Sequence, residues 1–272
     1  MTDIGEAVAV AAITKEDDEP CWYCKEELAE IVDNEEDEGP ESTGTNSDAI
    51  GKIPENKEDN NASKLGKNLI SNGYSVPQWK VKHPDTKKHP NLNTDIVAAA
   101  HHCIPGGASL AHANDLHKFM RKDGPYSLSS DIGYNVNHAN NGVWLPGNYA
   151  VRGSNNPPFD KNWSGYSTVF KNKYALDGME KAHGRQFHDA HRKYNGKVKK
   201  TLISIASKLV APDDKCPICN EKFDKSRPPF GLVGRLDLVS SEHKTMLTNP
   251  KKEEVSQGYY TSSRVKKKFN IV

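Results

Sequence analysis

The most regular pattern of apolar and polar positions lies in the second half of the chain. Large apolar residues recur there at intervals of three and four, which predicts the buried face of a helix that ends before Pro212. These residues are Val198, Leu202, Ile205, Ala206 and Leu209. Gly184 and Gly196 interrupt the wider helical region that begins near residue 174, so the pattern leaves room for two helices.

Shorter patterns predict a helix and strands elsewhere. The segment SLAHANDLHKFMRK, residues 109–122, spaces its apolar residues for one helical face. TDIVAAAHHCIP, residues 94–105, is interpreted as a helix or turn that leads into a short strand, and Val143 to Leu145 as a strand. The tail after residue 230 alternates enough between apolar and polar residues to predict short strands.

The net charge of +1 conceals two oppositely charged parts. Residues 1–60 carry −15 and residues 61–272 carry +16, counting Asp, Glu, Lys and Arg. A basic body is typical of nucleic-acid binding, because side chains that neutralise phosphates release counterions. An ordinary solvated surface is the alternative explanation of the same charge.

Residues 32–64 are acidic and rich in Gly, Pro, Ser and Asn, so we expect a linker without a packed core. No stretch approaches the roughly 20 apolar residues that span a bilayer. The short apolar run near the N-terminus follows acidic rather than basic residues. We therefore expect a soluble protein that lacks a signal peptide and does not insert into membranes.

Four of the five cysteines form two pairs, Cys21 with Cys24 and Cys216 with Cys219. Two such turns match the halves of a four-thiolate zinc site, so we expect one structural zinc ion. Redox chemistry is less favoured because no thioredoxin-like βαβ pattern surrounds either pair, and two disulfides are a third option in an oxidising space. Cys103 is predicted to be a small buried residue.

Two pairs of histidines suggest a metal centre. His101 and His102 are adjacent on the predicted strand, where neighbouring side chains point to opposite faces. His188 and His191 lie three residues apart in a segment predicted to be helical, which would place both on one face. Each histidine alone is most simply a satisfied polar side chain, but the joint arrangement, with Asn141, favours a site for one metal ion.

Three motifs in order, AHHCIPG from residue 100, NNGVWLP from residue 140 and FHDAHRKYN from residue 187, resemble those of the AHH-type nucleases. This family belongs to the HNH/endonuclease VII superfamily and occurs as toxin modules of bacterial polymorphic toxins and type VI secretion effectors. The resemblance extends over about residues 95–210. It implies an α+β, mainly helical fold around a ββα-metal hairpin and helix, to which the cysteine pairs would add a zinc-knuckle subdomain.

The resemblance also implies roles for particular residues. His101 would be a metal ligand, and His102 the general base that activates water. Asn141 would brace the hairpin or touch the metal. His191 would be a second ligand, and His188 would be a further ligand or a phosphate contact.

The chemistry expected of such a site is phosphodiester hydrolysis. One divalent ion (Mg, Mn, Ni or Zn) would neutralise charge on the phosphate, and an imidazole that titrates near neutrality would deprotonate water. Cations near the motifs would hold the phosphate backbone, although each alone is more often an ordinary surface charge. These candidate contacts are Arg152, Arg185, Arg192 and Lys193.

The expected domain order is a first zinc knuckle in 1–31, an acidic linker in 32–64, a nuclease domain in 65–211, and a second knuckle with a basic extension in 212–272. We expect a DNase that acts as a secreted antibacterial toxin in the target-cell cytoplasm. Its partners would be DNA, a cognate immunity protein, and a type VI machinery or a larger toxin polypeptide. An RNase of the same fold, or an inactive zinc-stapled nucleic-acid-binding module, are the alternatives.

Overall fold

The computed structural model describes residues 60–117, 119–120, 134–151, 158–209 and 232–271. The chain divides into two compact units that each combine several separate segments. The first unit comprises Met1–Lys64, His102–Asn141 and Asn195–Glu242, and the second comprises Leu65–His101, Gly142–Tyr194 and His243–Val272. Among the described residues, no helix has the length and apolar character needed to cross a membrane.

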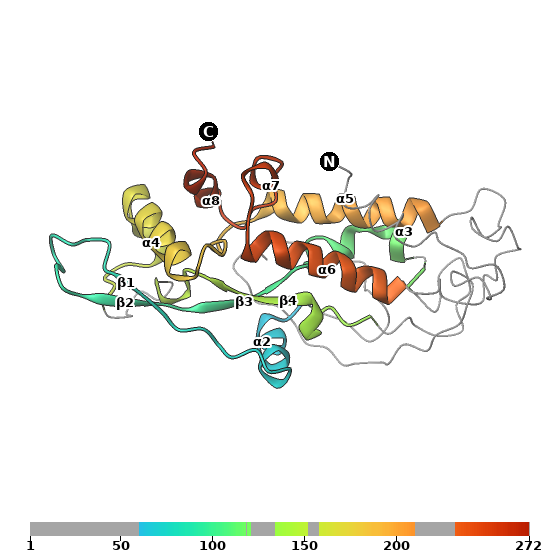
Figure 1. Ribbon diagram of the computed structural model, residues 1–272, viewed down its shortest axis with the longest axis horizontal. Coiled ribbons are helices and arrows are strands. Elements are labelled where there is room, and N and C mark those ends of the chain that lie inside the picture. Colours follow the sequence, from blue (N-terminus) through green and yellow to red (C-terminus); the bar gives the residue numbers. More distant parts are fainter. Residues whose placement is uncertain (1–59, 118, 121–133, 152–157, 210–231, 272) are drawn as a thin grey trace, which may run out of the picture. The chain divides into compact units, whose positions relative to one another are not determined.

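The second unit contains an antiparallel hairpin covered by a helix. Strands β1 (Trp79–Lys82) and β2 (Asn93–Ile96) pair with Trp79 opposite Ile96, and inward and outward side chains alternate along both. Helix α4 (Thr168–Lys181) packs against β1 (Figure 1). The sequence interpretation of residues 94–96 as a helix or turn was therefore wrong, because these residues pair with β1 instead.

The strands that carry the first two motifs pair with each other. They are β3 (Ala98–His102) and β4 (Gly142–Pro146). Cys103 N donates to Asn141 O at 2.8 Å at one end, and Gly147 N donates to Val97 O at 3.1 Å at the other. The end of β3 thus lies beside the start of β4, and the end of β4 lies beside the start of β3, so the two strands are antiparallel.

Helix α2 (Ala62–Ser71) explains the glycine of the second motif. A Cβ atom on Gly142 would lie 2.7 Å from Leu65 Cδ1 and 3.1 Å from Leu69 Cγ. Both leucines are buried, so a larger residue would force the helix away from β4. Glycine at this position lets α2 cover the strand that follows the motif.

Helix α5 (Arg192–Leu209) confirms the predicted apolar face, because Val198, Leu202, Ile205 and Leu209 are all buried. The break between the two predicted helices runs from the end of α4 to His191, whereas Gly196 lies inside α5. Gly184 has φ +91° in this break, a conformation that favours glycine.

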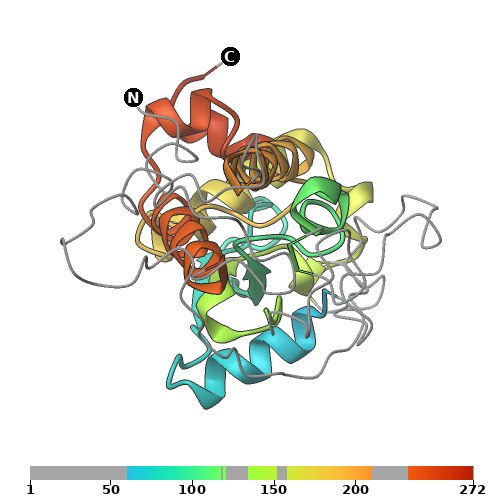
Figure 2. The ribbon, with the colours of Figure 1, turned by 90° about the vertical axis from the view of Figure 1, so that its right-hand side faces the viewer.

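The tail is helical, so the prediction of short strands was wrong. Helix α6 (Leu232–Thr248) buries Leu232, Leu236, Val239 and Leu247, whose spacing follows a helical period. Helices α5 and α6 run in opposite directions with nearly parallel axes (Figures 1 and 2). The remaining helices of the described residues are α3 (Asn114–His117), α7 (Lys252–Ser256) and α8 (Ser263–Lys268), with 3₁₀ turns at Leu110–His112, Ala139–Asn141, Tyr149–Val151 and Trp163–Gly165.

The predicted α+β class is confirmed, and a strand pair followed by a helix is present as β3, β4 and α5. Residues 109–122 form only a 3₁₀ turn and one short α-helix within their described part, although Leu110, Leu116, Phe119 and Met120 are buried as expected. Cys103 is also buried. Both CxxC pairs lie outside the described residues, so the zinc knuckle stays a prediction.

Candidate metal centre

His101 lies near the end of β3, and only 3% of its surface is exposed. Strand geometry holds its backbone, because β3 is paired with β4 along its length. A histidine on a paired strand has few positions available to its ring, which favours a fixed orientation of the imidazole.

His188 and His191 lie on the connection between α4 and α5 rather than on a helix. His188 N donates to Pro146 O at 2.7 Å, which forms a short parallel bridge to the end of β4. His191 directly precedes α5, which begins at Arg192. The prediction that both residues share a helical face was therefore wrong, because this segment hydrogen-bonds to a strand instead of to itself.

The three imidazoles nevertheless converge. The ring centroid of His101 lies 5.0 Å from that of His188 and 4.9 Å from that of His191, and the last two centroids are 5.2 Å apart. One potential ligand nitrogen of each ring lies within 4.8 Å of the other two. Within the part of the chain that the structure describes, they form the one group of three or more His, Cys, Asp or Glu residues with this geometry. We call these residues the histidine triad.

Aromatic rings surround the histidine triad. The ring of Tyr149 is nearly parallel to His188, with centroids 5.9 Å apart and an angle of 9°. Tyr194, which is fully buried, lies 5.5 Å from His101 and 6.1 Å from His191 between ring centroids. The rings of Tyr149 and Tyr194 thus lie next to the three imidazoles.

The donor set of the histidine triad suits a transition-metal ion. Neutral imidazole nitrogens bind Zn, Ni, Cu and Fe well, whereas Mg and Ca prefer oxygen ligands. Three protein ligands leave a coordination position for water or substrate, which is typical of catalytic rather than structural sites. The residues that the structure brings together therefore fit the divalent metal ion that HNH-type nucleases use.

His102 follows His101 in β3 and belongs to the first unit, where Asn137 holds its ring. His102 Nε2 lies 2.9 Å from Asn137 Oδ1, and the same oxygen accepts a hydrogen bond from Asn61 N at 2.8 Å. An oxygen can only accept, so Nε2 carries the proton in the neutral ring, and Nδ1 is the basic nitrogen.

Asn141 is a brace within the first unit. Its Oδ1 accepts from Ile104 N at 2.7 Å and from Ser240 Oγ at 2.9 Å. Its Nδ2 donates to Ile104 O at 2.9 Å and to Val136 O at 2.8 Å. Both donor and both acceptor positions of the amide are therefore used inside the fold. Of the two expected roles, bracing and metal contact, these bonds correspond to bracing.

The predicted nucleic-acid contacts differ in their surroundings. Arg192 and Lys193 are exposed at the start of α5. Arg185 is half-buried and donates to Trp144 O at 3.0 Å, and burial lowers the pKa of its guanidinium from the ordinary value. Arg152 lies outside the described residues, so its role stays a prediction.

Sequence reasoning missed Asn137. The signal available was its place in YNVNHANN, where asparagines two residues apart are typical of side chains that cap a turn. Asn135 Oδ1 indeed accepts from Asn137 N at 2.8 Å, which fixes the backbone of the residue that contacts His102.

Comparison with known proteins identifies a nuclease family. Residues 85–216 match the model of the AHH family, described as a nuclease family of the HNH/ENDO VII superfamily with conserved AHH. This range contains all three motifs, the histidine triad, His102 and Asn137. No curated protein and no solved structure matches the chain. The family match confirms the resemblance inferred from the motifs and supports a metal-dependent nuclease.

Proposed function

We propose, because residues 85–216 belong to the AHH nuclease family, that the protein is a metal-dependent endonuclease that hydrolyses phosphodiester bonds of DNA. The observation that carries this proposal is the convergence of His101, His188 and His191 on one point. Their ligand nitrogens lie within 4.8 Å of one another, so one metal ion can accept all three imidazoles as ligands.

In this proposal the histidine triad holds a single divalent ion. Its imidazole donors favour Zn or Ni over Mg, and Mn is an intermediate candidate. A divalent ion bound there would supply Lewis-acid stabilisation of the charge that develops on the phosphate. The paired strands and the connection before α5 hold the three rings together before substrate binds. The imidazoles therefore need little rearrangement during the reaction.

His102 acts as the general base. Its Nδ1 takes a proton from the attacking water, and Asn137 keeps the other nitrogen protonated and the ring oriented. A neutral imidazole can take this proton at the ring nitrogen that carries none. The adjacency of His101 and His102 on β3 gives one strand both a metal ligand and the base.

The basic charge of residues 61–272 supports a nucleic-acid substrate. Arg192 and Lys193 at the start of α5, together with Arg152 and Arg185, are the proposed contacts to phosphates. Phosphate contacts serve DNA and RNA alike, so RNA is the alternative substrate that the assay below separates.

We further propose that the enzyme is an antibacterial toxin, exported by a type VI machinery or as part of a larger toxin polypeptide, that acts in the cytoplasm of the target cell. The likeness of its motifs to toxin nucleases supports this role. A producing cell would need an immunity protein, and an acidic one would suit the basic body. A structural zinc ion bound by Cys21, Cys24, Cys216 and Cys219 completes the proposal.

The test compares wild type with His102→Ala on supercoiled plasmid and on total RNA. Each polymer is incubated in EDTA and then in Mg, Mn, Ni or Zn. We expect the wild type to nick plasmid with added metal, and His102→Ala to be slower by about 100- to 10,000-fold, the usual contribution of a positioned base. His112→Ala, which changes an exposed histidine, serves as the matched control. Degradation of RNA but not of plasmid would show that the substrate is RNA instead of DNA. Retained activity of His102→Ala would refute the assignment of His102 as the base.

A further inference from the structure

The segment that carries His188 is held by residues from the far end of the chain. Gln186, which is fully buried, donates from Nε2 to Met246 O at 3.1 Å and to Tyr259 O at 2.9 Å. Its Oε1 accepts from Thr261 N at 2.8 Å. The amide of one side chain therefore binds two C-terminal segments, the end of α6 and the turn before α8, to the connection that carries His188.

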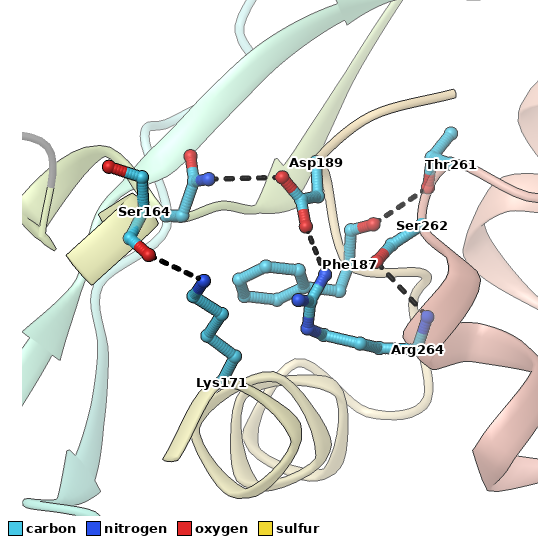
Figure 3. Close-up of polar contacts among 8 residues, drawn as sticks. Ser164, Lys171, Phe187, Asp189, Thr261, Ser262 and Arg264 are labelled. Atoms are coloured by element: carbon cyan, nitrogen blue, oxygen red, sulfur yellow. Dashed lines mark hydrogen bonds and ion pairs between the residues drawn. The ribbon is translucent and has the colours of Figure 1, made fainter. Parts of the chain in front are cut away.

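Thr261 contacts the chain on both sides of His188. Its hydroxyl donates to Phe187 O at 2.9 Å (Figure 3). Its carbonyl oxygen accepts from Asp189 N at 2.9 Å. The backbone before and after His188 is thus fixed by one buried residue. Since the direction of a side chain follows from the backbone that carries it, these bonds restrict where the imidazole points.

Asp189 adds a charged contact next to His188. Its carboxylate accepts from Arg264 Nη1 and, at 3.2 Å, from Asn148 Nδ2. The side chains of Arg264 and Asp189 are 15% and 14% exposed, so water screens this pair less than a surface pair. The Arg264 guanidinium also lies over the ring of Trp163, 5.2 Å from its centroid, which fixes the cation on a second side.

We propose that Thr261, Arg264 and Asp189 are positioning residues of the metal centre, which hold His188 in the direction required for ligation. This inference rests on the proposed metal-dependent function. Thr261 and Arg264 lie beyond residue 216, where the family match ends, so these two contacts come from outside the matched part of the chain. We call residues 259–264 the C-terminal clamp.

Removal of the ion pair should weaken metal binding before any substrate is present. Loss of an outer hydrogen-bond partner of a metal site typically costs 10- to 100-fold in metal affinity. We therefore expect Arg264→Gln and Asp189→Asn each to bind Co²⁺ about 10-fold or more weakly than wild type. Arg264→Lys keeps the positive charge and should recover part of the affinity, which a general loss of packing would not do.

The experiment is a Co²⁺ titration of the full chain followed by visible absorption. His191→Ala gives the baseline, so that any signal from the cysteine pairs is subtracted. Lys80→Gln is the matched control, because it removes the Lys80 to Asp95 ion pair, 70% and 69% exposed, from the hairpin of the same unit. Circular dichroism of each variant confirms that the fold is kept.

Because Co²⁺ affinity is measured without nucleic acid, the two proposals fail separately. Wild-type affinity in both Arg264→Gln and Asp189→Asn would overturn the positioning role and leave the nuclease proposal intact. Equal weakening in Lys80→Gln would also overturn it, since the effect would then be general. If Arg264→Gln and Asp189→Asn bind Co²⁺ weakly, Lys80→Gln binds it normally and the wild type cleaves neither polymer, the positioning role is supported and the nuclease proposal is refuted. A wild type that binds no Co²⁺ would overturn both.

Discussion

Two groups of histidines in the second unit differ in what their rings face. His83 and His89 have ring centroids 4.4 Å apart, closer than any pair in the histidine triad. However, His83 is almost fully buried, with Phe159 stacked at 5.5 Å and Phe170 edge-on at 5.7 Å between centroids. Its Nδ1 accepts from Asp85 N at 3.2 Å. Close histidine rings therefore do not by themselves make a metal site.

The difference lies in convergence and in support. The histidine triad turns three nitrogens toward one point, and hydrogen bonds to β4 and to the C-terminal clamp fix the connection that carries His188. The hairpin histidine His83 instead packs its ring into an aromatic cluster, where burial lowers its pKa from the ordinary value. One group is arranged for a ligand, and the other fills a core.

The largest effect that separates the two groups is the loss of metal binding. His191→Ala removes one of the three proposed ligands, so we expect metal affinity to fall by more than the roughly 100-fold that the loss of an outer hydrogen-bond partner costs. His89→Ala should leave the affinity unchanged, because the hairpin pair is outside the ligand set. Isothermal titration with Ni²⁺ or Zn²⁺ measures both. Equal losses in the two variants would remove the distinction between the groups.

The reverse effect is expected on stability. His83→Ala leaves a cavity among aromatic rings and removes the acceptor of Asp85 N, so we expect the free energy of unfolding to fall by about 2 kcal/mol. Metal affinity should not change. Urea unfolding followed by fluorescence tests the first expectation, and unchanged stability would show that the hairpin histidine has no structural role.

A smaller effect is expected on the pH dependence of stability. Because the folded-state pKa of His83 is lowered, the unfolded chain binds a proton below the ordinary value of about 6.5 while the folded chain does not. Stability is therefore complete above this value and falls as pH decreases, by at most about 1.4 kcal/mol per pH unit from this group. In EDTA, the gap between wild type and His83→Ala should narrow from pH 7.5 to 5.5. A constant gap would contradict the buried neutral imidazole.

The sequence was sufficient for features that local pattern determines. The apolar face of α5 followed from its period, and β3 and β4 from short apolar runs ended by Pro, Gly or Asn. The structure brings together His101, His188 and His191, the histidines that the sequence analysis grouped. Their roles as ligands and the role of His102 as the base stay predictions.

Features that depend on distant partners could not be predicted. The segment around His188 looked helical, but its backbone hydrogen bonds go to Pro146 and Thr261. Likewise, no local pattern connects Arg264 with Asp189, which is 75 residues earlier in the chain. The tail was misjudged because short windows emphasised alternation, whereas the buried residues of α6 repeat over four turns.

The most direct test of the central claim is the recovery of nuclease activity when metal is returned to the stripped protein. Wild type is treated with EDTA, freed of chelator, and assayed on supercoiled plasmid while Ni²⁺, Mn²⁺ or Zn²⁺ is added stepwise. We predict no nicking before metal is added and a rise that follows occupancy of the histidine triad, absent from His191→Ala at the same metal concentrations. Undiminished cleavage by the stripped protein, or equal recovery in His191→Ala, would contradict the assignment of the histidine triad as the catalytic metal centre.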